Sequence, residues 1–430
     1  MSEIVLPGDG GEGPGPGLLR GAMERRYSRR DMLRMAGAGG AALGAGALLA
    51  ACGVSGTKAP VSSSKSAVEQ YWAGKKQTPQ VNWAQWPLYI DVSSTNKSDH
   101  PSIDMFEKKT GVKVDYFEVI QDDGPFFAKV QPSLSAGQYS GYDVATITNG
   151  VYLTKFQELG FLVPLDHSYL TNFAKYAGAK YKDESYDPGN KFSVPWQSGF
   201  TGIGYNPKYT GREINSFFDL FDPKFKGKVG MFADNEDLPN AMLVAMGYDP
   251  AKTGPTQWRK AAAKLEQQKK AGIVRQYGHQ GYINSLTKGD LWISQAWSGD
   301  IFQANASGGS LKFVIPKEGG VIWTDNLVIL KGTKNPVSAI ELMDWYFRPD
   351  IAAMVAEGVN YITPVPGAKT YVQQDASRAS GSNKASLQYI ANSPLVFPTK
   401  AEYAQTYRYR ILTNKELQVW DSIFEPIYLG

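Results

Sequence analysis

The sequence predicts an α/β protein with two lobes, each an open sheet flanked by helices. Strand-like and helix-like segments alternate from residue 81 to residue 160, and the alternation starts again after residue 206. Later segments are left over for both units, so the chain should cross between the lobes more than once. A chain of 430 residues is long enough for two domains and a large core.

The first unit opens with VNWAQWPLYI at residues 81–90, which predicts a strand and its exit loop. Residues 101–111 predict a helix with Ser102 or Asp104 near its cap and Gly111 at its end. Apolar side chains then alternate along the next segment, as they do on a strand. In order, the remaining elements of this unit are a strand at 112–119, a helix at 125–137, a strand at 142–148 and a helix at 151–160.

The second unit follows the same alternation but is longer. Its last helix begins with a capping box made by Thr413 and Glu416. The pair of helices before it is broken ahead of Pro349. In order, its expected elements are a helix and a strand within 216–232, helices at 238–247 and 255–272, a strand running into a helix at 289–309, extended segments at 310–316 and 321–330, helices within 335–358 and a helix at 413–424.

The composition argues against several classes of function. A net charge of +4 is too small to indicate a nucleic-acid partner. The single cysteine excludes an internal disulfide, and the three histidines lie far apart in no metal-ligand spacing. The sequence also contains no G-x-S-x-G motif and no dinucleotide fingerprint. We therefore expect no metal, no cofactor and no enzymatic activity.

The N-terminus has the pattern of an export signal. Residues 25–53 read RRYSRRDMLRMAGAGGAALGAGALLAACG, and the apolar part is too short and too rich in Gly and Ala for a confident membrane helix. It ends at Cys52, the only cysteine, in a context that resembles a lipoprotein cleavage site. The match to a twin-arginine signal rests on Ser28, Arg29, Arg30, Met32 and Leu33. We expect a signal peptide at 1–51, lipidation of Cys52 and a flexible tether at 52–78; an uncleaved membrane anchor is the alternative.

Residues 321–330, VIWTDNLVIL, contain an unusual pair of side chains in an apolar segment. Trp323 and Asp325 are two apart, so on a strand they face the same side. A desolvated carboxylate is costly unless a positive group meets it. The segment therefore predicts either a cation-binding position or a strand end where Asp325 is hydrogen-bonded to a nearby turn.

Beside these observations, the chain resembles the extracellular solute-binding proteins of ABC importers, in the spermidine/putrescine-binding branch. The resemblance covers about residues 79–430, and PKEGGVIWTDNLVI is its most specific segment. It implies a two-lobed periplasmic-binding-protein fold of type II, with the ligand between lobe 1 (79–198 plus 323–368) and lobe 2 (199–322 plus 369–430). The other motifs that carry it are QWPLYI, FEKKTGVKV, YDVATIT, FSVPWQSGFTGIGYN, DPKFKGKVGM, AWSGD and YITPVPGA.

The resemblance also implies a set of ligand-binding residues. Aromatic side chains and carboxylates are contributed by both lobes, as a closing clamp requires. The implied residues are Trp86, Tyr89, Asp234, Asp237, Trp297, Trp323, Asp325 and Tyr361.

Several assignments have alternatives. Trp83 could exchange roles with Trp86, and one of Asp234 and Asp237 could cap the helix that follows them. Asp300 could supply a missing charge, although a cap of the following helix is the preferred interpretation.

Two positions depart from the family pattern. Leu88 stands where the family has a carboxylate between the two first-loop aromatics. Gly150 or Val151 stands where a tyrosine is expected, with Tyr152 one step further on. These departures leave the ligand open but do not affect the expected fold.

Together these features predict a binding protein rather than a catalyst. It would be held outside the cytoplasm by a lipid, capture a cationic polyamine as a monomer, and pass it to an ABC permease. Alternatives are a protein that binds a sugar, an anion or another organic cation, and an exported glycoside hydrolase that uses paired carboxylates such as Asp234 and Asp237. A sugar site would not need so many acids, and an anion site would use Arg or helix N-termini.

Overall fold

The computed structural model describes residues 64–429 except 97, 280 and 307. Its strands form one mixed sheet in the order β2-β1-β3-β9-β4-β7-β5-β6, with β10 paired to β9 and β8 to β4. The strands are β1 (Gln80–Gln85), β2 (Lys113–Glu118), β3 (Val144–Thr148), β4 (Ser193–Tyr205), β5 (Val229–Phe232), β6 (Val274–Gly278), β7 (Ile293–Trp297), β8 (Lys312–Val314), β9 (Gly320–Ile329) and β10 (Thr406–Tyr407).

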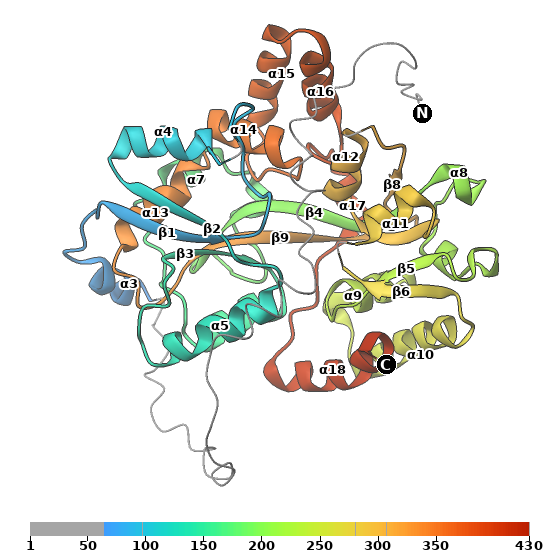
Figure 1. The fold of residues 1–430 in the computed structure, drawn as a ribbon. Coiled ribbons are helices and arrows are strands. Elements are labelled where there is room, and N and C mark those ends of the chain that lie inside the picture. Colours follow the sequence, from blue (N-terminus) through green and yellow to red (C-terminus); the bar gives the residue numbers. More distant parts are fainter. Residues whose placement is uncertain (1–63, 97, 280, 307, 430) are drawn as a thin grey trace, which may run out of the picture. The chain divides into compact units, whose positions relative to one another are not determined.

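The sheet consists of two parallel groups joined by two long strands. β1 lies parallel to β2 and β3, and β5 lies parallel to β6 and β7. Between the groups run β4 and β9, which are antiparallel to each other; β9 is antiparallel to β3, and β4 is antiparallel to β7. Figure 1 shows β4 and β9 passing through the centre from one group to the other. We call β1–β3 with their helices the first lobe and β5–β7 with theirs the second, which confirms the predicted two-lobed α/β fold.

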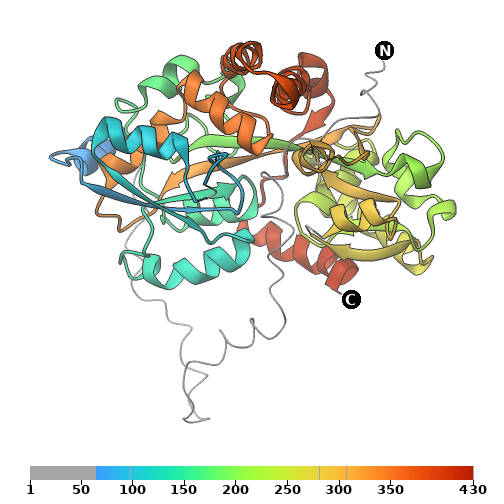
Figure 2. The same cartoon turned by 45° about the horizontal axis from the view of Figure 1, so that its top comes forward.

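Helices cover both faces of each strand group. In the first lobe α4 and α13 lie on one side of the sheet and α5 on the other; in the second, α11 and α12 lie opposite α9, α10 and α18 (Figure 1, Figure 2). The α-helices are α3 (Lys65–Trp72), α4 (Pro101–Thr110), α5 (Asp123–Ser135), α6 (Val151–Glu158), α7 (Thr171–Tyr176), α8 (Pro207–Thr210), α9 (Asp237–Ala245), α10 (Pro255–Lys270), α11 (Tyr282–Lys288), α12 (Ser298–Ala306), α13 (Pro336–Trp345), α14 (Pro349–Val359), α15 (Ala368–Arg378), α16 (Gly381–Asn392), α17 (Lys400–Ala404) and α18 (Asn414–Leu429).

The predicted helix ends are mostly confirmed. α4 ends at Gly111, whose φ of 74° is in the left-handed region that favours glycine. α18 begins with the predicted box, in which the Thr413 amide donates to Glu416 at 3.0 Å and the Glu416 amide donates to the Thr413 hydroxyl at 3.3 Å. Ser102 and Asp104 lie near the start of α4, as predicted, but neither side chain caps it, since the N-cap residue is His100. Instead Asp91, from the preceding loop, accepts the Ser102 amide at 2.8 Å.

The expected tether is shorter than the sequence suggested. Within residues 52–78, the described part contains α3, and Trp72 at its end is only 5% exposed. The Trp72 indole donates to the Pro164 carbonyl at 2.8 Å, and the Thr78 amide donates to Ser338 at 2.9 Å. One buried indole thus attaches a segment of otherwise tether-like composition to the first lobe. The predicted signal peptide, Cys52 and the first part of the tether lie outside the described residues.

The lobe limits predicted at 198/199 and 322/323 fall inside β4 and β9, the strands that both groups share. After the limit at 368/369, α15 packs on α14 and α16, whereas α18 packs on α10 of the second lobe. Within residues 64–429, none of the helices combines the length and the apolar character needed to cross a bilayer.

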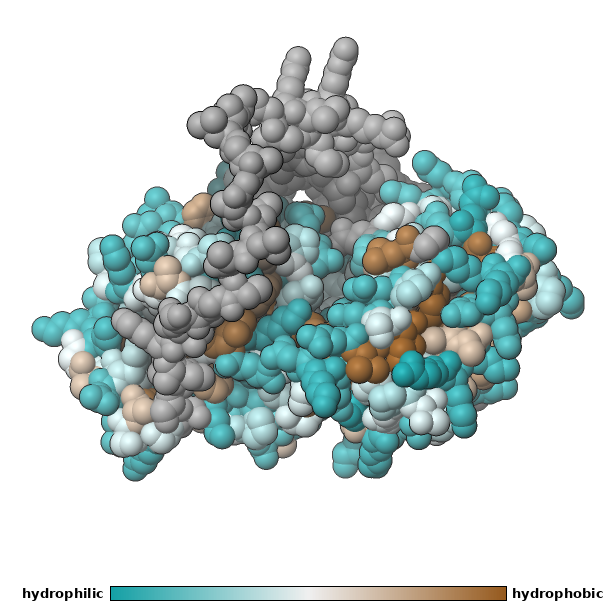
Figure 3. Space-filling model, turned by 90° about the horizontal axis from the view of Figure 1, so that it is seen from below, coloured by the Kyte–Doolittle hydropathy of each residue, from teal (hydrophilic) through white to brown (hydrophobic). Residues whose placement is uncertain are grey.

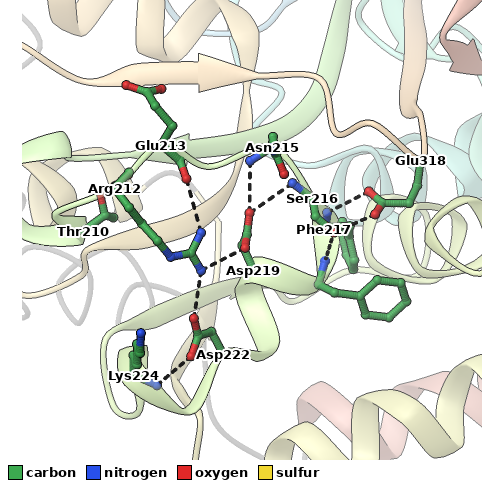
Figure 4. Close-up of polar contacts among 11 residues, drawn as sticks. Thr210, Arg212, Glu213, Asn215, Ser216, Phe217, Asp219, Asp222, Lys224 and Glu318 are labelled. Atoms are coloured by element: carbon green, nitrogen blue, oxygen red, sulfur yellow. Dashed lines mark hydrogen bonds and ion pairs between the residues drawn. The ribbon is translucent and has the colours of Figure 1, made fainter.

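A polar network, here called the Arg212 network, holds the segment at 210–224 in place (Figure 4). The Arg212 guanidinium contacts Asp219 at 2.9 Å and Asp222 at 2.8 Å. Backbone amides of Asn215 and Ser216 donate to Asp219, each at 3.0 Å. Every carboxylate in this network therefore has a positive or N–H partner within the fold.

Large apolar side chains on the surface are scattered. Figure 3 shows hydrophilic side chains over most of the face seen from below, with apolar side chains in patches between them. Among the described residues, the exposed large hydrophobic side chains are Leu88, Met105, Phe117, Leu159, Phe218, Tyr371, Tyr389, Tyr407, Ile411 and Leu429.

Candidate functional site

Asp325 lies in the middle of the sheet. All ten residues of β9 are buried, and Asp325 pairs with Thr148 of β3 on one side and with Gln197 of β4 on the other. Its carboxylate accepts the Tyr89 hydroxyl at 2.5 Å and the Thr148 hydroxyl at 2.6 Å. Burial raises the pKa of Asp325 to about 6. Asp325 is therefore not at a strand end, but Thr148, one of its two donors, does begin the turn after β3, so the hydrogen bond to a nearby turn in the alternative is present.

Four rings form a continuous chain beside Asp325. The Trp323 ring lies 6.5 Å from Trp297 and 5.4 Å from Tyr361 between centroids, and Tyr361 meets Tyr89 edge-on at 5.6 Å. We call Tyr89, Tyr361, Trp323 and Trp297 the aromatic chain. A Cβ on Gly199 of β4 would lie 2.3 Å from the Trp323 ring, so only glycine leaves room for the indole there.

Asp237 places a second carboxylate at the other end of the aromatic chain. It accepts hydrogen bonds from the Trp297 indole at 2.8 Å, the Tyr409 hydroxyl at 2.7 Å and the Thr201 hydroxyl at 2.5 Å. Burial raises its pKa. Because Asp325 pairs with β3 of the first lobe and Asp237 begins α9 of the second, the chain of rings joins acids from both lobes.

Asp234 has the capping role that the sequence left open between two residues. Its Oδ1 accepts the amides of Glu236 at 2.9 Å, Asp237 at 2.5 Å and Leu238 at 3.3 Å, at the start of α9. Its Oδ2 is buried without a hydrogen-bond partner among the described residues. Burial, followed by the charge of Asp237, raises the pKa of Asp234 to about 8.

Asp300 also joins the site. It lies in the first turn of α12, but its carboxylate accepts the Tyr361 and Tyr282 hydroxyls, each at 2.9 Å. The preferred sequence interpretation, a helix cap, was wrong because two tyrosines from other elements take the carboxylate oxygens. Burial raises the pKa of Asp300.

The sequence interpretation missed two further carboxylates, the buried Asp123 and the partly buried Glu236. Asp123 of α5 accepts the Thr148 amide at 3.2 Å, and Glu236 accepts the Val151 amide at 2.6 Å. Asp123 was hidden because its neighbour Asp122 gives the normal capping signal, and Asp122 indeed accepts the Gly124 amide at 2.7 Å. Tyr282 and Tyr409 had no local signal beyond the high aromatic content of the chain.

Six carboxylates therefore gather in one region, and we call them the acidic group. Among the described residues, none of them lies within 4.0 Å of a Lys, Arg or His nitrogen. No three of the described His, Cys, Asp and Glu residues are arranged to hold a metal ion. Faces of aromatic rings beside unpaired carboxylates suit an organic cation. The members are Asp123, Asp234, Glu236, Asp237, Asp300 and Asp325.

Comparisons with known proteins agree with this geometry. The profile of the family described as "Bacterial extracellular solute-binding protein" matches residues 102–381. This chain belongs to that family. The spermidine/putrescine-binding periplasmic protein of Escherichia coli K12 is 30% identical to it over 263 residues, which cover 61% of this chain and 73% of the relative. The putrescine/cadaverine-binding protein of Pseudomonas aeruginosa is 30% identical over 283 residues, covering 63% and 77%.

The solved structures include a putative spermidine/putrescine ABC transporter from Listeria monocytogenes. Its structure matches with a TM-score of 0.66 and 25% identity, covering 81% of this chain and 99% of that one. The predicted resemblance to the spermidine/putrescine-binding branch is thus confirmed. The names of the family and of these relatives describe proteins that bind solutes.

Most of the predicted site residues of this solute-binding protein come together, but Trp86 does not join them. Its indole donates to the Thr146 carbonyl at 3.1 Å, and no ring contact or hydrogen bond connects it to the aromatic chain in the described structure. Trp83 belongs to the core, at 1% exposed, with its indole on the Thr146 hydroxyl at 3.1 Å. The two tryptophans therefore do not exchange roles. Leu88, which stands where the family has a carboxylate, is half exposed. As a leucine it brings no charge to this position.

One large surface hollow lies away from these residues. It has a volume of about 410 Å³ and lies between α15 and α16. None of its lining residues is aromatic or acidic, so it offers none of the groups that make the aromatic chain and the acidic group suitable for a cation. It is lined by Gln373, Ala376, Ser377, Lys384, Gln388, Ala391 and Asn392.

Proposed function

We propose that this chain is the extracytoplasmic substrate-binding protein of an ABC importer and that it captures a linear polyamine, such as putrescine or spermidine, for delivery to the permease. The observation that carries this proposal is the aromatic chain with unpaired carboxylates at both of its ends. The names of the relatives in Escherichia coli and Pseudomonas aeruginosa support the same ligand class.

Polyamines match both parts of the site chemically. An ammonium group is attracted to an aromatic face by about 0.5–2 kcal/mol. Each methylene that leaves water contributes about 0.8 kcal/mol, and a hydrogen bond to a charged group contributes about 1.5–3 kcal/mol. A few such contacts reach about −8 kcal/mol, which is micromolar affinity, after the ordering costs are subtracted.

Within this proposal, the positions of the acids set the roles. Asp325, held by Tyr89 and Thr148, would bind an ammonium group on the side of the first lobe. Asp237, held by Trp297 and Tyr409, would bind another on the side of the second. Trp323 and Tyr361, whose rings lie between these acids in the chain of contacts, would cover the methylenes. A sugar could stack on the same rings but would leave the six carboxylates of the acidic group without a positive partner.

Capture would also require the lobes to move. β4 and β9 are the strands that connect the two groups, so bending there would open and close the site as a hinge. A direct contact between the lobes already exists, because Glu236 at the start of α9 accepts the Val151 amide at the start of α6.

Isothermal titration of the full chain with putrescine, spermidine and spermine tests the proposal. We expect micromolar or tighter binding of at least one polyamine, and at least a tenfold loss of affinity in Asp325→Asn, whose amide keeps the shape but not the charge. Asp375→Asn, an acid-to-amide change on exposed α15, is the matched control and should leave the affinity unchanged. No heat with any polyamine from a folded chain would rule the function out.

The proposal includes a lipid anchor at Cys52, as the lipoprotein-like context of this cysteine suggests. A Cys52→Ser chain should then move from the membrane fraction to the soluble fraction when cells are fractionated, while its polyamine affinity stays the same. Equal recovery of both chains in the membrane fraction would contradict lipidation.

A further inference from the structure

Three carboxylates meet one short turn, the residues 148–151 between β3 and α6. The Thr148 hydroxyl donates to Asp325 at 2.6 Å and the Thr148 amide donates to Asp123 at 3.2 Å. The Val151 amide donates to Glu236 at 2.6 Å. These acids come from β9, from α5 and from the start of α9, so the tertiary structure gathers three acidic side chains around four residues.

The backbone of the turn is shaped for a close carboxylate. Gly150 has a φ of 138°, a conformation that side chains other than glycine rarely adopt. A Cβ at this position would lie 2.0 Å from Oε1 of Glu236. Glycine therefore allows both the conformation and the approach of Glu236.

Asp123 and Glu236 are not neutralised by protein cations. Asp123 is 6% exposed, and its Oδ1 is buried without a hydrogen-bond partner among the described residues. The basic side chain on α6, Lys155, has its ammonium over the Tyr152 ring at 4.7 Å and is in no ion pair within the described structure. Burial raises the pKa of both carboxyls well above the usual range, and the nearby charges of Asp325 on Asp123 and of Asp123 on Glu236 act in the same direction.

The two acids lie apart from the positions already assigned. Neither contacts a ring of the aromatic chain through a hydrogen bond, whereas Asp325 and Asp237 each accept one from Tyr89 or Trp297. A diamine has two ammonium groups, which Asp325 and Asp237 would take.

Of the four remaining acids, Asp234 accepts three backbone amides and Asp300 accepts two tyrosine hydroxyls. Asp123 and Glu236 accept one amide each, so they keep the most free acceptor capacity for a third ammonium group.

We propose that Asp123 and Glu236 form an additional cation subsite at the turn 148–151, which binds the third ammonium group of a linear triamine and makes the chain prefer triamines to diamines. This inference rests on the proposed polyamine function. In a purely structural role, one oxygen of Asp123 would accept the Thr148 amide and one oxygen of Glu236 would accept the Val151 amide. The side-chain amide of Asn or Gln could supply such an oxygen equally well, so this role does not require a carboxylate.

The test is calorimetric titration of the full chain with putrescine and spermidine, using Asp123→Asn and Glu236→Gln. Each variant should lose at least tenfold in spermidine affinity and change less than twofold for putrescine. Asp375→Asn serves again as the control for loss of one negative charge. Equal losses for the two ligands, or no loss for either, would overturn the subsite.

Two other outcomes have clear meanings. If the wild-type chain binds neither amine, the polyamine function itself fails and not the subsite alone. If Asp123→Asn does not fold, as judged by its thermal transition, Glu236→Gln decides the matter, since Glu236 is only partly buried and precedes α9.

Discussion

The acidic group and the Arg212 network both contain carboxyl groups, but the pKa values of these groups are shifted in opposite directions. In the Arg212 network, hydrogen bonds from Arg212 and from the amides of Asn215 and Ser216 outweigh the effect of burial and lower the pKa of Asp219 (Figure 4). The Lys224 amide and then Arg212 lower the pKa of Asp222. In the acidic group, burial dominates and raises the pKa of every member.

The difference separates acids that the fold itself neutralises from acids that, under the proposed function, would be neutralised by a bound cation. A carboxylate that serves the fold is matched by groups of the fold, as Asp219 is by Arg212. Asp325 and Asp237 accept hydrogen bonds from hydroxyl and indole donors, which hold the side chains in place but bring no full positive charge. A bound cation would complete the second group, which is why strongly perturbed acids mark functional sites.

The largest expected effect is the dependence of polyamine affinity on pH. Burial raises the pKa of Asp325 from 3.8 to about 6 and that of Asp234 from 3.8 to about 8. At pH values from about 4 to about 8, the folded, ligand-free chain therefore holds more protons than the unfolded chain. Its stability should therefore fall as the pH rises from about 4 to about 8. A cation favours the charged form of Asp325, so affinity should rise about tenfold from pH 5 to pH 7, while polyamine ammonium groups stay protonated.

Calorimetry at a series of pH values checks this prediction, with thermal unfolding of the ligand-free chain measured alongside. Constant affinity from pH 5 to pH 8 would mean that the acidic group does not pair with the ligand. The contrast with the Arg212 network would then reflect burial alone.

The next effect concerns the donor that holds Asp237. Trp297→Phe keeps an aromatic face but removes the indole hydrogen bond of 2.8 Å to Asp237. Because hydrogen bonds to charged groups contribute about 1.5–3 kcal/mol, we expect about a tenfold loss of polyamine affinity.

Trp258→Phe is the matched control for this change. It removes the 3.0 Å bond from the Trp258 indole to Thr253 in the core of the second lobe. It should lower the free energy of unfolding while leaving affinity within twofold. Equal effects of the two variants on affinity would show that Trp297 acts through stability and not through the site.

The smallest effect should come from the paired acids. Asp219→Asn weakens the contact with Arg212, and because that guanidinium is partly exposed we expect a loss of about 1 kcal/mol in the free energy of unfolding. Denaturant titration measures this loss, and the polyamine affinity should not change. A fall in affinity would mean that the Arg212 network is coupled to the acidic group and does not serve stability alone.

Local pattern predicted the elements well, because their signals lie close together in the chain. The period of two placed Trp323 and Asp325 on one face of β9, and the box of Thr413 and Glu416 marked the start of α18. The resemblance to solute-binding proteins added Tyr89, Asp237, Trp297 and Tyr361. The structure links all four to Trp323 and Asp325 through ring contacts or hydrogen bonds to a carboxylate.

The sequence by itself thus determined the α/β elements, the two-lobed arrangement and the placement of Trp323 and Asp325 on one face of a strand. Only the tertiary structure decided which acids share a neighbourhood. Asp123 and Glu236 are far apart in the chain and meet at residues 148–151, Asp300 turns to Tyr361 instead of capping α12, and Trp86 stays outside. Periodicity and capping report interactions over a few residues, whereas the partner and the pKa of a buried carboxylate depend on what distant segments bring to it.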